Sequence, residues 1–387
     1  MKFEFATASR ICFGPGAAAE AVEHAAALGR RALLVTGRDA RRAEPWRARL
    51  QERGVSTTVF SVPGEPTLGL VREGVRADPD CQLVIGFGGG SALDAAKAIA
   101  ALLGNGGDPL DYAEVIGLGR PITRPARPWI ALPTTAGTGT EVTRNAVLRS
   151  EEHRVKVSLR SPHLLPSLAA IDPGLTLDLP REITAATGLD ALTQLLEPFV
   201  SCRANPLADG FCREGLARVA RSLRRACDCG QDYAAREDMA LASLCGGLAL
   251  ANAGLGAVHG LAAVLGGAFP APHGAVCASL LAPVMEANLR ALDQRAPGHP
   301  VRPRFAEVAR LLTGHPGAAA SDGIEWVRQL SRDLAIPPLS SWGVRAADFP
   351  SLAEKSLAAS SMKANPLPLE LGEILAILQT ATSGEPG

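Results

Sequence analysis

The stretch CQLVIGFGGGSALDAAKAIAALLG, residues 81–104, joins an apolar run to a helical pattern through three consecutive glycines. The apolar run at 81–87 has the length of a buried strand, and the residues after the glycines have the apolar spacing of a helix. Glycines at 88–90 let backbone N–H groups approach an anion closely, and the N-terminus of the helix adds partial positive charge. Ser91 and Asp94, three residues apart, predict a capping box. The stretch therefore predicts a strand–loop–helix unit that binds phosphate.

Strands and helices alternate around this unit. Further strands are predicted at 31–37, 56–62 and 128–135, and helices at 43–54 and 68–77. This alternation predicts a parallel sheet whose strand C-termini carry the ligand contacts.

The pattern changes near residue 180, after the turn-rich segment 171–182. Apolar spacing from there on predicts helices, at 191–200, 211–228, 236–253 and 324–335. We therefore expect an α/β dinucleotide-binding domain over residues 1–178, built on a parallel sheet. An all-α domain is expected over residues 179–387.

A second loop supports nucleotide binding. The segment ALPTTAGTGTE, residues 131–141, follows a predicted strand and concentrates threonine hydroxyls with glycines. Hydroxyls and backbone amides at a strand end suit phosphate, ribose or a nicotinamide carboxamide. The first loop departs from the dinucleotide-binding pattern G-x-G-x-x-G, because Ser91 takes the place of the last glycine. Either loop is therefore also compatible with an ordinary turn that binds no nucleotide.

Composition limits the possible partners. The chain has 387 residues, 39 of them basic and 39 acidic, so no net charge attracts it to nucleic acid or to a membrane surface. No signal peptide is recognisable, and no run approaches the roughly 18 apolar residues of a membrane span. Eight irregularly spaced cysteines are typical of free thiols in a reducing compartment. We expect a cytoplasmic protein.

The seven histidines include two that stand fourteen residues apart, His259 and His273. Earlier in the chain, Asp190 and Gln194 occupy positions i and i+4 of a predicted helix. One carboxylate and two imidazoles suit Fe(II) or Zn(II). From spacing alone, hydrogen-bonded core histidines are the plainer alternative.

The sequence as a whole resembles the iron-containing (group III) alcohol dehydrogenase family. The resemblance rests on several stretches along nearly the full length, among them GEPT (64–67), GGGSALDAAKAIA (88–100), ALPTTAGTGTEVTRNAVL (131–148), TAATGLDALTQLLEPFVS (184–201) and VHGLAAVLGGAFPAPHGAVCASLLAPVMEAN (258–288). It implies an NAD(P)-dependent oxidoreductase that interconverts a small alcohol and an aldehyde or ketone. The implied cofactor-binding residues are Gly88, Gly89, Gly90, Ser91, Asp94, Lys97, Thr134, Thr135 and Thr138. Family habit also implies a homodimer or larger homo-oligomer.

The resemblance implies four metal ligands, and this chain departs from the family at one of them. Asp190, His259 and His273 match, and the two histidines become the candidate catalytic residues, but Gln194 stands where the family has histidine. At Ala263 the family often carries another histidine, credited with proton relay. Three readings follow: a divalent metal (Fe²⁺ or Zn²⁺) in a weakened site, a metal-independent reductase similar to the maleylacetate reductases, or a degenerate site in a non-catalytic nucleotide-binding protein.

The end of the first predicted strand bears on the choice between NAD and NADP. The family typically has aspartate directly after VT, where it bonds ribose hydroxyls and repels a 2′-phosphate. Here the stretch is VTGRDA, with Gly37 in that place and Arg38 next. Arginine pairs well with phosphate, so NADP is favoured, while Asp39 keeps NAD open. The alternative for Arg38 is a solvated loop residue.

Overall fold

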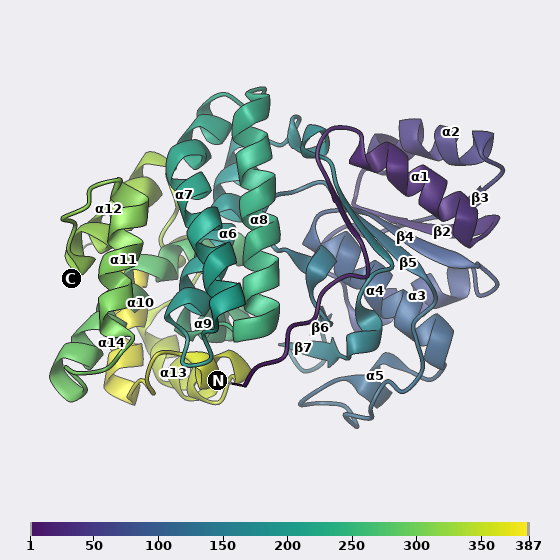
Figure 1. The fold of residues 1–387 in the computed structure, drawn as a ribbon. Helices are drawn as coiled ribbons and strands as arrows, with labels where there is room; N and C mark the ends of the chain where they lie inside the picture. The colour runs from purple at the N-terminus through teal and green to yellow at the C-terminus, as the bar shows by residue number, and fades with distance from the viewer. Residues whose placement is uncertain (1, 385–387) are drawn as a thin grey trace. The chain divides into compact units, whose positions relative to one another are not determined.

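The computed structural model describes residues 2–384 and divides into two compact units (Figure 1). Residues Phe5–Asp178 form an α/β unit. The chain from Leu179 onward forms a helical unit, together with the short segment that precedes Phe5. The expected fold class, a parallel-sheet α/β region followed by an all-α region, is confirmed.

The α/β unit is built on a six-stranded sheet with the order β1-β8-β5-β4-β2-β3, and every pairing in it is parallel. Its strands are β1 (Ile11–Phe13), β2 (Arg31–Thr36), β3 (Ser56–Ser61), β4 (Leu83–Gly88), β5 (Trp129–Pro133) and β8 (Leu168–Ile171). From β2 the chain first builds outward to β3 and then returns to the other side with β4. The strand order therefore reverses between β2 and β4, and ligands of such sheets bind at this point, beyond the C-terminal strand ends.

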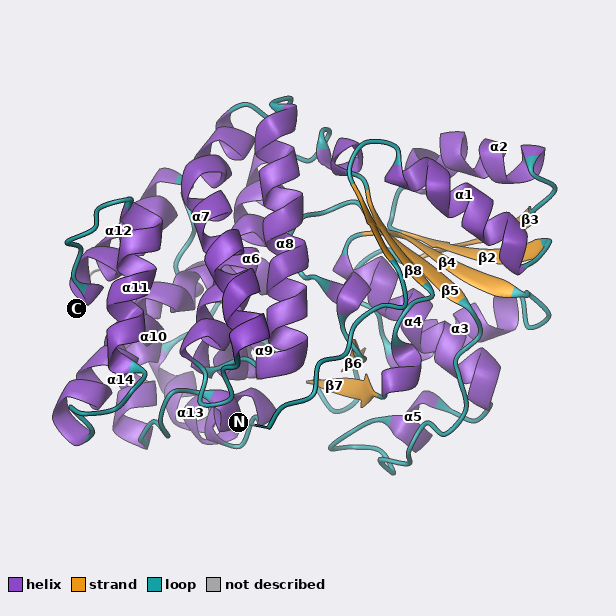
Figure 2. Ribbon diagram, in the orientation of Figure 1, coloured by secondary structure: helices purple, strands orange, loops and turns teal. Residues whose placement is uncertain are grey.

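Helices cover both faces of the sheet (Figure 2). One face packs against α1 (Ala17–Leu28) and α2 (Glu44–Glu52), and the other against α3 (Leu68–Ala77) and α4 (Gly90–Asn105). Strand β2 shows why two layers are needed, because its alternate residues join different cores. Leu34 belongs to the α1/α2 side, and Leu33 and Val35 belong to the α3/α4 side. Such two-sided burial explains why these strands read as continuous apolar runs.

The described structure adds a hairpin that the sequence pattern did not predict. Strands β6 (Asn145–Ser150) and β7 (Val155–Arg160) pair antiparallel, outside the main sheet. Their buried side chains, such as Leu148 and Leu159, join the core on the α3/α4 side. A short helix, α5 (Pro109–Tyr112), lies earlier in the same unit.

The predicted capping box at the start of α4 is wrong. The helix begins at Gly90 with Gly89 as its N-cap, and no side chain caps it. Asp94 instead accepts hydrogen bonds from the Thr140 hydroxyl, at 3.0 Å, and from the backbone N–H of Val147, at 3.2 Å. The start of α4 is thus left without a side-chain acceptor, which is the arrangement that suits an anionic ligand.

Among residues 179–384 the structure has helices and turns and no strand. The helices are α6 (Arg181–Val200), α7 (Pro206–Asp228), α8 (Tyr233–Ala253), α9 (Ala257–Ala268), α10 (His273–Arg295), α11 (Arg302–Thr313), α12 (Ala320–Asp333), α13 (Phe349–Leu357) and α14 (Leu371–Ser383). Helix α6 packs on α7, α8 and α10, so nearly all of its second half is buried. Gly188 makes this packing close, because a Cβ there would lie 2.2 Å from Leu223 Cδ1.

Helix α10 is long and apolar enough, by length and composition, to cross a membrane. In the structure, however, 67% of its apolar window is buried inside the protein, against α6, α9, α12 and α14. That burial is what the central helix of a folded domain shows. We therefore interpret α10 as a core helix of the helical unit.

Candidate active site

Three helices of the helical unit bring a cluster of metal-binding side chains together. Asp190 comes from α6, His259 from the first turn of α9, and His273 and Cys277 from the first two turns of α10. One ligand atom from each of these four residues lies within 4.8 Å of the others. The structure thus unites three residues singled out in the sequence and adds a thiol.

The distances inside the cluster are short. Nε2 of His259 lies 3.4 Å from Oδ1 of Asp190, and Nε2 of His273 lies 3.9 Å from the same oxygen. The two imidazole centroids are 5.4 Å apart. Asp190 and His259 are buried, whereas the His273 side chain is one-third exposed. The carboxylate is therefore the centre of the group, and His273 is its most accessible member.

Glu197, one turn beyond Gln194 on α6, fixes the orientation of His259. Its Oε2 lies 2.6 Å from Nδ1 of His259, and its Oε1 accepts the backbone N–H of Val258 at 2.7 Å. A proton on Nδ1 that is donated to the carboxylate leaves Nε2 directed at Asp190. Burial works to lower the pKa of His259, but Glu197 and Asp190 outweigh it and raise that pKa to about 10.

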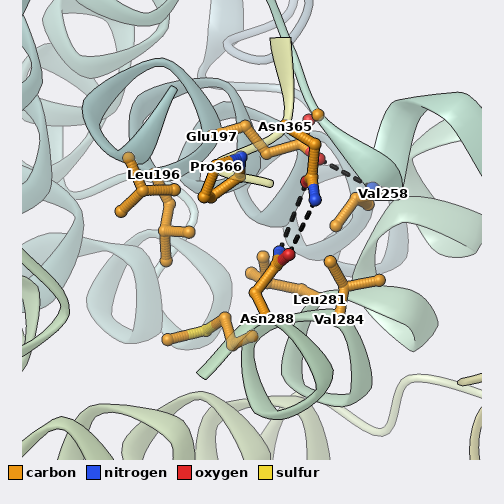
Figure 3. A pocket seen from close by; sticks show the side chains of 11 residues that line it. Leu196, Glu197, Val258, Leu281, Val284, Asn288, Asn365 and Pro366 are labelled. Atoms are coloured by element: carbon orange, nitrogen blue, oxygen red, sulfur yellow. Dashed lines mark hydrogen bonds between the residues drawn. The ribbon is translucent and has the colours of Figure 1, made fainter. Parts of the chain in front are cut away.

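Side chains from other segments also cap α9, whose N-cap is Gly256. Glu197 accepts from Val258, and Oδ1 of Asn365 accepts the N–H of Ala257 at 3.1 Å. A Cβ on Gly256 would lie 2.9 Å from both Asn365 Oδ1 and Glu197 Oε1, so a larger residue there would make both caps shift. Nδ2 of Asn365 donates to Asn288 Oδ1 at 2.7 Å, beside a small pocket that Glu197 also lines (Figure 3).

Two buried side-chain oxygens on α6 lack hydrogen-bond partners among the described residues: Oδ1 of Asp190, which belongs to the cluster, and Oε1 of Gln194, one turn further along the helix. Unsatisfied buried oxygens are costly, and a cation is one way to satisfy them. Burial works to raise the pKa of Asp190, but His259, His273 and Gln194 together lower it, so the carboxylate is ionised at neutral pH. The carboxylate and the two imidazoles that the cluster brings together suit a divalent transition metal.

Gly274 lets α10 begin close to α6. A Cβ at this position would lie 2.4 Å from the backbone oxygen of Ala186, so any larger residue would push the helices apart. Because His273 is the first residue of α10, this close approach sets its distance from Asp190, one turn further along α6. The invariant geometry of the helix then places Cys277 one turn after His273.

In the α/β unit, the two glycine- and threonine-rich loops pack directly on each other. A Cβ on Gly89 would lie 3.1 Å from Thr135 Cγ2, and a Cβ on Gly90 would lie 2.6 Å from Thr138 Cγ2. The backbone N–H of Thr134 donates to the carbonyl of Gly88 at 2.9 Å. These residues gather at the carboxyl ends of β4 and β5. Ser91, in the first turn of α4, is partly exposed.

The end of β2 adjoins the same place. A Cβ on Gly88 would lie 3.2 Å from the backbone nitrogen of Gly37, whereas a Cβ on Gly37 would meet nothing within 4 Å. Arg38 is exposed, and its Nε donates to the carbonyl of Pro63 at 2.9 Å. Asp39 is paired with Arg41 through two hydrogen bonds of 2.8 and 2.9 Å.

Lys97 lies deep in the same unit, with its side chain fully buried. Its Nζ is 2.8–3.0 Å from the carbonyls of Thr140, Thr143 and Asn145 and from the Thr143 hydroxyl. Burial lowers the pKa of Lys97 to about 8, although Asp94 opposes the shift. Lys97 and Asp94 therefore hold the chain that follows the threonine loop, and through it the loop itself.

Residues 8–173 match the family described as iron-containing alcohol dehydrogenase, and residues 184–382 match the C-terminal domain of the Fe-containing alcohol dehydrogenase family. The chain belongs to the iron-containing alcohol dehydrogenase family. It is 36% identical to the 1,3-propanediol dehydrogenase of Klebsiella pneumoniae over 98% of each chain.

Solved structures agree with this assignment. A 1,3-propanediol oxidoreductase superposes with a TM-score of 0.90, at 36% identity over 98% of this chain and 100% of that one. A sulfoacetaldehyde reductase from Bifidobacterium kashiwanohense, solved in complex with NAD⁺, superposes with a TM-score of 0.86, at 27% identity over 99% of each chain. The protein is thus an oxidoreductase of a family that interconverts alcohols and carbonyl compounds and uses a nicotinamide cofactor and iron.

Sequence reasoning missed two members of the cluster, Glu197 and Cys277. A signal existed for both, because Glu197 lies seven residues after Asp190 and Cys277 lies four residues after His273. Those spacings place each on the same helix face as its partner. Which helix faces which, and hence which atoms meet, depended on the packing of α6, α9 and α10.

Proposed function

We propose that this protein transfers a hydride between a nicotinamide dinucleotide and a small alcohol or its aldehyde or ketone, with a divalent metal ion bound by the cluster on α6, α9 and α10. The observation that carries the proposal is the convergence of Asp190, His259 and His273, whose ligand atoms lie within 4.8 Å of one another. The buried Asp190 oxygen, which has no hydrogen-bond partner among the described residues, supports a cation bound beside it.

In the balanced reaction, the alcohol and the oxidised cofactor give the carbonyl compound, the reduced cofactor and one proton. When bound, the metal supplies Lewis acidity toward the substrate oxygen, and nicotinamide supplies or accepts the hydride. Asp190 would provide the negative charge that holds the cation, and Glu197 keeps one proton of His259 on Nδ1, so that Nε2 is the nitrogen that would give up its proton to the solvent and bind the metal. The methyl group of Ala263 cannot relay a proton, so the hydroxyl proton of the alcohol must reach solvent without help from the side chain at that position.

Gln194 favours a second candidate, a metal-independent reductase of the same fold. An amide oxygen is neutral and a weaker donor than imidazole, so it contributes less to metal affinity. In that case His273, which is the most accessible member of the cluster, would hydrogen-bond the carbonyl oxygen and supply its proton. The histidines then act as acids and hydrogen-bond donors instead of ligands.

For the cofactor we propose that Gly88–Ser91 at the start of α4 hold the pyrophosphate, with Thr134, Thr135 and Thr138 beside the nucleotide. The uncapped α4 N-terminus and the close packing of the two loops support this placement. We favour NADP over NAD, since Arg38 is exposed beyond β2 while the acid beside it, Asp39, is already paired with Arg41.

The test is a hydride-transfer assay across small aldehydes and ketones with NADH and NADPH. Turnover that consumes reduced cofactor in proportion to the carbonyl compound supports the proposal. A protein that only binds nucleotide would change the cofactor fluorescence without any turnover, and that result would overturn the assignment. Metal content measured on the same sample separates the metal-dependent reaction from the metal-independent one.

A further inference from the structure

Cys277 is a member of the cluster for which neither the proposed reaction nor the family resemblance assigns a role. It lies on α10 one turn after His273 and is fully buried. Its Sγ is 3.7 Å from Nε2 of His273 and within 4.8 Å of the ligand atoms of Asp190 and His259. Without a metal, this contact is a weak hydrogen bond between a thiol and an imidazole.

Three of the separations between donor atoms are close to those of a single coordination sphere. Zn–N bonds of about 2.0–2.1 Å and Zn–S bonds of about 2.3 Å give tetrahedral edges of roughly 3.3–3.8 Å. In the cluster, His259 Nε2 to Asp190 Oδ1 is 3.4 Å, His273 Nε2 to Asp190 Oδ1 is 3.9 Å, and Cys277 Sγ to His273 Nε2 is 3.7 Å. These three edges lie in or close to that range, and all four donor atoms lie within 4.8 Å of one another.

An independent observation indicates that a cation belongs among these atoms. Oδ1 of Asp190 is buried and has no hydrogen-bond partner among the described residues. The Asp190 side chain is only 2% exposed, so bulk solvent does not reach this oxygen. It is also the oxygen that Nε2 of His259 and Nε2 of His273 approach, at 3.4 and 3.9 Å.

We propose that Cys277 is a metal ligand of this protein. Its thiolate takes the place of the strong donor that is lost where Gln194 stands instead of histidine, giving a carboxylate, two imidazoles and a thiolate around the ion. On binding, the S–H bond breaks, the proton leaves to solvent and the sulfur electron pair forms the bond to the metal. Thiolate is a soft ligand, so the site prefers Zn²⁺ to Fe²⁺. The inference rests on the proposed metal-dependent function.

Cobalt(II) tests the inference directly, because it reports both that a site is filled and whether sulfur is bound. The metal-free protein is titrated with Co²⁺ without oxygen, and the visible d–d bands are followed together with the near-ultraviolet sulfur-to-cobalt charge-transfer band. We expect both sets of bands to saturate together in the wild-type chain. This measurement on the unaltered protein does not depend on the folding of any variant.

Two substitutions assign the band. Cys277→Ser keeps the size of the side chain and should abolish the charge-transfer band, retain d–d bands and weaken Co²⁺ and Zn²⁺ binding by about 100-fold or more, since even outer partners of metal ligands are worth 10–100-fold. Cys212→Ser is the matched control, because that thiol is equally buried, on α7, and lies outside the cluster. It should change neither the band nor the affinity.

The outcomes separate the inference from the function on which it rests. Wild-type protein that shows d–d bands without a charge-transfer band, or a band that survives Cys277→Ser, overturns the role of Cys277 and leaves the metal-dependent reaction in place. Wild-type protein that binds no Co²⁺ overturns the metal site and the inference with it. A saturating band that is lost only in Cys277→Ser establishes the ligand.

Discussion

Substituting Glu197 by glutamine changes one atom of the contact that orients His259. In the wild-type chain, Oε2 of Glu197 lies 2.6 Å from His259 Nδ1 and Oε1 accepts from Val258 N at 2.7 Å. Glutamine keeps the acceptor for Val258 but presents an NH₂ group to Nδ1. His259 must then accept there and carry its proton on Nε2, the atom that faces Asp190. A protonated Nε2 does not bind a metal.

The size of the effect follows from the contact that is lost. A hydrogen bond to a charged group contributes about 1.5–3 kcal/mol, and about 1.4 kcal/mol corresponds to tenfold in affinity. We therefore expect Glu197→Gln to weaken Zn²⁺ binding by about 10- to 100-fold, the range usual for a partner that orients a metal-bound histidine. Competition with a chromophoric chelator measures the affinity in wild type and variant.

A matched control separates this effect from a general loss of stability. Thr193 lies on the same helix, is fully buried, and its hydroxyl donates only to the Leu189 carbonyl at 2.8 Å. Thr193→Val should lower the free energy of unfolding by about 1 kcal/mol and leave Zn²⁺ affinity unchanged. Equal metal affinities for wild type and Glu197→Gln would refute the orienting role of the carboxylate.

Three further predictions concern the α/β unit. Arg38→Ala should lower kcat/KM for NADPH by about tenfold and change that for NADH by less than about twofold, because only the 2′-phosphate needs the guanidinium; an NADPH preference that survives the substitution counts against this role. Gly88→Ala places a Cβ 2.7 Å from that of Ala92 and 3.2 Å from the Gly37 nitrogen, so both cofactors should bind more weakly in a fluorescence titration, and unchanged binding would argue against the loop as their site. Burial raises the pKa of Glu141 from 4.5 to about 7, so the stability this carboxyl contributes is fully present below pH 4.5 and is lost as pH rises through about 7. Because glutamine does not ionise, the free energy of unfolding of Glu141→Gln, measured with urea, should rise relative to that of the wild type by up to about 3 kcal/mol between about pH 4.5 and 8. A difference in unfolding free energy that is independent of pH would contradict the pKa shift.

The local sequence pattern predicted those strands and helices whose burial produces a continuous apolar run or a regular apolar spacing. Strands β2, β3, β4 and β5 were expected from apolar or β-branched runs, and helix α3 was expected over the residues that form it. Strands β1 and β8 were missed, since they have only three and four residues and are defined by long-range pairing, of β8 with β5 and of β1 with β8. The hairpin β6–β7 was missed because its alternating pattern lay inside a stretch interpreted only through its resemblance.

The cluster shows the same division between local and long-range information. Spacing placed Asp190 and Gln194 on one helix face, but on its own it did not bring His259 and His273 to them. That required Gly274 to set α10 against α6 and Gly256 to admit the caps of α9. The capping box failed for a related reason, because Asp94 is drawn to Thr140, which is remote in sequence.

The metal dependence of carbonyl reduction tests the central claim most directly. The chain is stripped of metal with a chelator, and aldehyde-dependent oxidation of NADH and NADPH is measured before and after Zn²⁺ or Fe²⁺ is added back. Since a Lewis-acidic ion supplies several kcal/mol to such a reaction, we predict that stripping lowers the rate by about 100-fold or more and that one ion per chain restores it. Full activity in strictly metal-free protein would contradict the assignment of Asp190, His259 and His273 as the ligands of a catalytic metal.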